Sequence, residues 1–152
     1  MNRITRIAVG AAGAAALLTA PVPAFAAASG ADTATATATV TTCKYALQAG
    51  LATYACADVT GSSVVIYGKI SLAGPPDGPV SWQTLYTNLS AEVVGGNSLG
   101  SVSGSTPFHS TTVQVNGFTA TAPCGSTVRA TFSVQGSGPY GTRPVVEVPV
   151  TC

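Results

Sequence analysis

Short stretches of alternating apolar and polar residues, separated by turn residues, follow one another from Val40 to the end of the chain. The alternation has the two-residue period of β-strands, and no stretch has the period of an amphipathic helix. The breaks contain Gly, Pro, Asn and Asp, which turns require. We therefore predict an all-β domain with strands at 40–47, 52–59, 63–72, 80–87, 90–94, 110–115, 118–122, 127–134 and 144–151.

Eight or nine short strands in about 115 residues favour a two-sheet β-sandwich of immunoglobulin or fibronectin type. A small Greek-key barrel is the alternative. In true immunoglobulin domains a disulfide spans the conserved Trp, whereas here each bridge is expected to be local, so the prediction concerns the architecture alone. One hairpin has a local signal, because Asn116-Gly117 between two apolar stretches predicts a two-residue type I′ turn. That turn would set Val115 opposite Phe118.

The chain has four cysteines: Cys43, Cys56, Cys124 and Cys152. An even number in an exported chain predicts two disulfides, for which three pairings exist. We predict the sequential pairing, Cys43–Cys56 and Cys124–Cys152, because each bridge agrees with a hairpin register. The first sets Tyr45 opposite Tyr54, and the second sets Val128 opposite Val148 and Arg129 opposite Glu147. A zinc site is disfavoured, since no C-x-x-C pair exists.

The N-terminal segment has the pattern of a secretory signal peptide. Arg3 and Arg6 precede an apolar stretch over 7–20, and Ala24-Phe25-Ala26 offers a small-x-small cleavage site. An N-terminal membrane anchor is the alternative, disfavoured because the stretch is short and rich in Ala and Gly. We therefore predict a signal peptide over 1–26, a flexible Ala/Thr-rich leader over 27–39 and a domain over 40–152. We expect an extracellular location, with no membrane attachment after cleavage.

Charge narrows the range of partners. Without the two arginines of the signal peptide, four basic side chains remain against five acidic ones, and only 7% of the chain is charged. A near-neutral surface without a basic cluster argues against nucleic acid and anionic membranes. The Ala/Gly-rich signal, the Thr/Gly/Val-rich body and the paired cysteines resemble small secreted proteins of actinobacteria, in style and not as a family.

Candidate catalytic groups are few. His109 is the single histidine, and a Ser-His-Asp site would need it with Asp58 or Asp77. His109 lies in the sequence Thr106-Pro107-Phe108-His109-Ser110, just before a predicted strand, so it is interpreted as a loop histidine. We expect no enzymatic activity, no metal and no cofactor.

Aromatic residues suggest binding instead. Trp82 and Tyr86 lie on one face of a predicted strand, and Leu85 and Leu89 on the other. If the leucine face is the core, the aromatic pair forms an exposed strip for sugar rings or a protein partner. The alternative is that Trp82 packs in the core.

We expect a secreted, non-enzymatic β-sandwich that binds a protein or cell-surface partner. One alternative is an inhibitor of an extracellular protease or amylase, acting through a stiff loop at 73–80, which includes Asp77, or at 135–143. A second is a polysaccharide- or cell-wall-binding module that uses Trp82, Tyr86 and Tyr140. The sequence leaves the oligomeric state and the identity of the ligand open.

Overall fold

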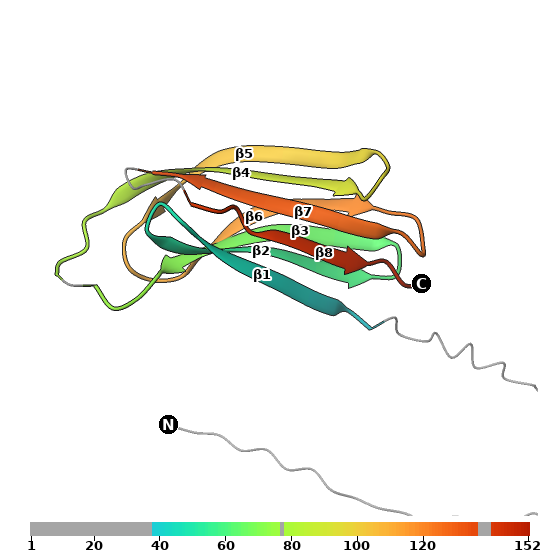
Figure 1. The fold of residues 1–152 in the computed structure, drawn as a ribbon, viewed down its shortest axis with the longest axis horizontal. Helices are drawn as coiled ribbons and strands as arrows, with labels where there is room; N and C mark the ends of the chain where they lie inside the picture. The colour runs from blue at the N-terminus through green and yellow to red at the C-terminus, as the bar shows by residue number, and fades with distance from the viewer. Residues whose placement is uncertain (1–37, 77, 137–140) are drawn as a thin grey trace, which may run out of the picture. The chain divides into compact units, whose positions relative to one another are not determined.

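The structure is a computed structural model that describes residues 38–76, 78–136 and 141–152. Its strands are β1 (Val40–Gln48), β2 (Leu51–Thr60), β3 (Ser63–Leu72), β4 (Gln83–Val93), β5 (Ser98–Phe108), β6 (Val113–Thr121), β7 (Thr127–Gln135) and β8 (Val145–Pro149). They form two antiparallel layers (Figure 1): sheet A in the order β1-β2-β3-β6, and sheet B in the order β5-β4-β7-β8. The predicted two-sheet β-sandwich is confirmed. Within the described residues, no helix has the length and apolarity needed to cross a membrane.

The core lies between the sheets and follows from the alternation of each strand. Inward-facing side chains of β2, β3, β4, β7 and β8 are almost fully buried, whereas their neighbours in sequence face outward. The largest buried side chains are Phe108, Phe132, Ile66, Ile70, Leu85 and Leu89. Each such side chain contributes about 1.5–3 kcal/mol when removed from water. Leu85 and Leu89 therefore define the inner face of β4, which decides between the two faces that the sequence left open.

Both predicted disulfides and both of their registers are confirmed. Cys43 is bonded to Cys56 across the β1–β2 hairpin, and Tyr45 lies opposite Tyr54. Cys124 is bonded to Cys152, and the β7–β8 pairing sets Val128 opposite Val148. The turn of the first hairpin is at Ala49-Gly50, where both residues have a positive φ.

The predicted hairpin at Asn116-Gly117 is wrong. Residues 113–121 form the single strand β6, which pairs along its length with β3. The register shifts between Ile66 and Gly68, so that Asn116 and Gly117 together lie opposite Tyr67 in a β-bulge. A Cβ at Gly117 would overlap the Ile66 carbonyl oxygen, which explains why glycine is needed there.

Sheet B also differs from the prediction. The two strands predicted at 80–87 and 90–94 are one strand, β4, which begins after Trp82. The eleven residues of β5 were not predicted, because this Ser/Gly-rich segment has no apolar alternation. Residues Ser101–Ser105 are exposed on both faces, so the strand needs no apolar face.

Gln48 joins the two sheets at one edge. Its Nε2 donates to Thr53 Oγ1 at 2.7 Å and to the Phe132 carbonyl at 3.3 Å, and its Oε1 accepts from the Val134 N–H at 3.2 Å. The β7–β8 pairing ends at Thr131, apart from a hydrogen bond from the Phe132 N–H to the Pro144 carbonyl at 3.2 Å. The Gln48 amide bonds the next two backbone groups of β7, in place of a neighbouring strand. The side chain is buried, with 3% exposed, and fully bonded.

Candidate binding surface

The outer face of sheet B presents an aromatic and polar surface. Tyr86 and Asn88 point outward from β4 because Leu85, Thr87 and Leu89 point inward. On the neighbouring strands, Ser105 and Gln135 lie opposite Tyr86. The Tyr86 side chain is 63% exposed, which makes it accessible to a ligand.

Trp82 lies at the start of this face, in the residue before β4. Gln83 pairs with Phe108, so the next positions outward place Trp82 beside His109. The two rings stack with centroids 4.7 Å apart and planes inclined by 28°. The His109 ring is fixed in turn by a hydrogen bond between its Nδ1 and Ser110 Oγ at 3.0 Å. Trp82 is nevertheless 73% exposed, so the stack supports the indole and leaves most of it accessible.

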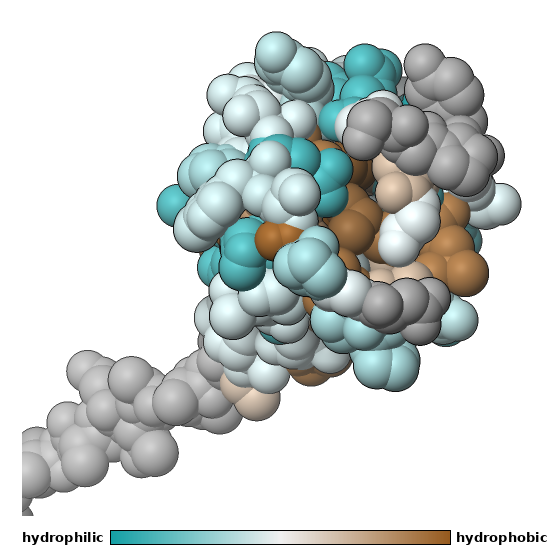
Figure 2. All heavy atoms as spheres, turned by 90° about the vertical axis from the view of Figure 1, so that its left-hand side faces the viewer, coloured by the Kyte–Doolittle hydropathy of each residue, from teal (hydrophilic) through white to brown (hydrophobic). Residues whose placement is uncertain are grey.

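The end of the sandwich that carries the loop before Trp82 has further apolar surface. Figure 2 views this end and shows hydrophobic residues gathered between hydrophilic ones. Strand ends on this side contribute Leu47, which is exposed, and Leu72 and Val113, which are half-buried. Trp82 is therefore one of several accessible apolar groups at this end.

A cavity of about 420 Å³ lies beside Tyr86 on the same outer face. Its polar lining comes from three strands and the segment before β8: Asn88, Ser103, Ser133, Gln135 and Arg143. Asn88 Nδ2 donates to Ser103 Oγ at 2.7 Å, which fixes the orientation of the amide. Hydroxyl, amide and guanidinium groups around a tyrosine ring supply both donors and acceptors for a ligand rich in hydroxyl groups.

The far end of this face carries an ion-pair cluster. Arg129 Nε lies 2.7 Å from Glu147 Oε1, and Arg129 Nη1 lies 3.3 Å from Glu92 Oε1. The hydrogen bond and negative charge of Glu147 raise the pKa of Arg129 above its usual value. The predicted Arg129–Glu147 pairing is confirmed, and Glu92 is a second partner that the sequence did not reveal. These three side chains form ion pairs with one another. The cluster marks the end of the aromatic part of the face.

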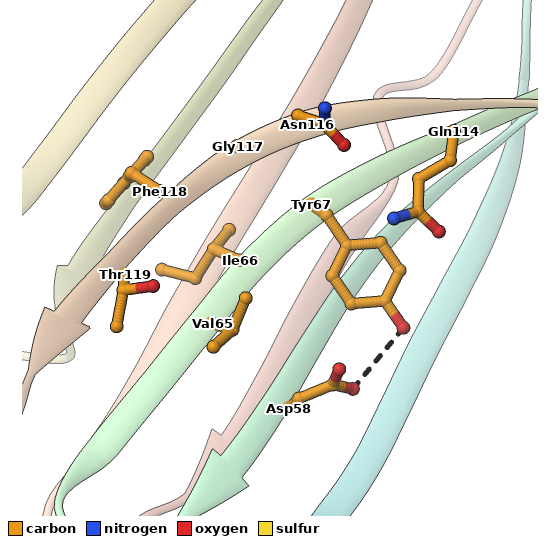
Figure 3. A pocket seen from close by; sticks show the side chains of 9 residues that line it. All are labelled: Asp58, Val65, Ile66, Tyr67, Gln114, Asn116, Gly117, Phe118 and Thr119. Atoms are coloured by element: carbon orange, nitrogen blue, oxygen red, sulfur yellow. Dashed lines mark hydrogen bonds between the residues drawn. The ribbon is translucent and has the colours of Figure 1, made fainter.

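Sheet A has a smaller hollow, of about 300 Å³, where the β6 bulge passes Tyr67 (Figure 3). The Tyr67 hydroxyl points toward Asp58 and donates to its Oδ1 at 3.3 Å. Burial raises the pKa of Tyr67, and the negative charge of Asp58 and the hydrogen bond raise it further. The neutral Tyr67 hydroxyl therefore donates its hydrogen bond to Asp58. This hollow offers less accessible aromatic surface than sheet B does.

The predicted binding residues have different outcomes. Trp82 and Tyr86 share one exposed face, and the alternative in which Trp82 packs in the core is wrong. Asp77 and Tyr140 lie outside the described residues. His109 is a loop residue, as predicted, and its role as the stacking partner of Trp82 was missed. Ser103 was also missed, because β5 was not predicted.

Comparisons with known proteins give no assignment: no family model, curated protein or solved structure matches the chain. Among the residues that the structure describes, no three His, Cys, Asp or Glu side chains gather as metal ligands.

Proposed function

We propose that this chain is exported and acts outside the cell as a non-enzymatic module that binds a cell-surface polysaccharide through the outer face of sheet B. The observation that carries the proposal is the exposed Trp82, stacked on His109 and in line with Tyr86. An indole held in place pays little conformational entropy when it binds. Its open face can cover the apolar C–H surface of a sugar ring.

The spacing of the two rings favours a chain ligand over a single sugar. Trp82 and Tyr86 are four residues apart along an extended backbone, which corresponds to about 13 Å. A ligand that touches both rings must therefore span several sugar units. The cavity beside Tyr86 adds hydrogen-bonding groups for the hydroxyls of one of those units.

Export is supported by two features. The first 26 residues have the charge, apolar stretch and cleavage pattern of a signal peptide. The four cysteines form two structural disulfides, which persist in oxidising compartments outside the cytosol.

The test is a co-sedimentation assay with purified protein and insoluble cellulose, chitin, xylan and peptidoglycan. We expect at least one of these polymers to bind, and binding to shift the fluorescence of Trp82, the single tryptophan, to shorter wavelength. Trp82→Ala and Tyr86→Ala should each weaken binding about tenfold or more, which is a loss of about 1.4 kcal/mol.

Tyr45→Ala is the matched control, since Tyr45 is 62% exposed on the outer face of sheet A. It should bind like the unchanged protein. The proposal fails if no polymer binds, if binding saturates without a change in Trp82 emission, or if all three variants behave alike.

A further inference from the structure

β5 is an edge strand of sheet B whose outer side has no backbone partner among the described residues. In a strand of this kind, every second residue points its N–H and C=O away from the sheet. The central segment, Ser101–Ser105, is exposed at all five positions. This segment contains no charged residue and no proline. The β-bulge at Leu99-Gly100 precedes it, and Pro107 follows it.

The other three edges carry features that prevent the addition of a further strand. β8 is five residues long and has a proline on each side of its core, Pro144 and Pro149. β6 is interrupted by the bulge at Asn116-Gly117. β1 has Lys44 on the inner side of its edge, and its end is occupied by the contacts of Gln48 with β7. The central part of β5 is thus the unprotected edge of the described fold.

A groove runs along the inner side of this edge, between β5 and β6. It has a volume of about 250 Å³ and an apolar part formed by Leu89, Val102 and Val115. Its polar part consists of hydroxyl and amide side chains, among them Thr87, Thr106, Gln114 and Asn116. No residue that lines it is charged.

From this combination we propose that the β5 edge is a docking site for an extended, uncharged peptide segment of a protein partner, which joins sheet B as a fifth strand. Backbone hydrogen bonds to β5 supply the affinity in this mode, and pockets for alternate side chains supply the selectivity. Alternate residues of the added strand point to the inner side, where the groove accepts an apolar side chain beside Val102 and Val115. The uncharged lining disfavours an acidic or basic side chain there, because it offers no counter-charge.

The test uses nitrogen-15-labelled protein and a synthetic peptide, acetyl-Thr-Val-Thr-Val-Thr-Val-Thr-amide. Methylation of alternate backbone nitrogens leaves the peptide one bonding edge and prevents its own aggregation. We expect saturable changes in the amide resonances of residues 101–105 and of the groove, and amide exchange at β5 slowed about tenfold or more. A peptide methylated at every nitrogen should cause neither effect.

Val102→Lys places a charge at the groove and should abolish these changes. Val145→Lys is the matched control, because Val145 is similarly exposed, 42% against 37%, on the opposite edge of the same sheet. It should leave peptide binding intact.

Three results would overturn the proposal. The first is the absence of a resonance change in the unchanged protein at the highest soluble peptide concentration. The second is equal binding by the Val102→Lys and Val145→Lys proteins, with both folded as judged by their spectra. The third is a dimeric mass in sedimentation velocity that Val102→Lys converts to monomer, which would make a second copy the occupant of the edge. None of these results bears on polysaccharide binding by Trp82.

Discussion

Tyr67 illustrates how one side chain on the outer face of sheet A is controlled by its surroundings. Its ring is 9% exposed, its hydroxyl donates to Asp58, and the Lys69 ammonium lies 5.4 Å from the ring centroid. Burial and the Asp58 carboxylate disfavour the phenolate form, so the pKa of Tyr67 is raised in the folded state. The unfolded chain lacks both effects and releases the proton at a lower pH.

This difference predicts a loss of stability in alkaline solution. The Tyr67 contribution should be fully present below pH of about 10, the ordinary pKa of tyrosine, and should be lost as the pH rises through the raised pKa. Urea unfolding at a series of pH values measures the effect. Tyr67→Phe should flatten this part of the profile, whereas Tyr45→Phe should not; equal slopes for the two variants would contradict the assignment.

At the scale of strands, the contact between β1 and β7 depends on a single amide. Replacing Gln48 by Leu removes the partners of the Phe132 carbonyl and the Val134 N–H while retaining an apolar side chain. Each buried group left unpaired costs about 1–3 kcal/mol, so for these two groups we expect a loss of about 2–6 kcal/mol in the free energy of unfolding. Gln114→Leu on the exposed face of β6 is the control and should change stability by no more than about 0.5 kcal/mol. Chemical denaturation compares the two, and similar losses would refute the bridging role.

The strands show which parts of the fold the sequence could predict. Apolar alternation identified β2, β3 and β7, because their inner faces are buried in the core. The turn predicted at Asn116-Gly117 was wrong because a tight turn and a β-bulge favour similar residues. Only the pairing of β6 with β3 decides between the two. β5 was missed for the opposite reason, since an edge strand exposed on both faces carries no apolar pattern.

At the scale of the whole molecule, the sequence predicted only part of the candidate binding surface. The period of β4 placed Trp82 and Tyr86 together, but the stacking of Trp82 on His109 joins residues from two different loops. The cavity beside Tyr86 likewise needs β5 and β7 as neighbours of β4, and this order of strands is a product of the complete fold.

The stability of the whole domain should depend strongly on its disulfides. In the chain-entropy model, the bridges with sequence separations of 13 and 28 residues stabilise by about 3 and 3.6 kcal/mol. Their sum is comparable with the 5–15 kcal/mol typical of a domain. We expect either Cys→Ala pair alone to fold with a lower melting temperature, and the variant lacking all four cysteines to be largely unfolded at 37 °C. Circular dichroism during heating tests this, and an unchanged melting temperature for the four-cysteine variant would contradict it.

The same two bridges determine how the domain responds to mechanical force. When the chain is pulled between residues 43 and 152, tension passes through each disulfide, and the loops that the bridges close cannot lengthen. Only the segment between Cys56 and Cys124 can unravel, which limits the added contour length to about 230 Å. If the module binds a cell surface as proposed, its extension under load would be limited to this length. Reduction of the two disulfides would increase that extension.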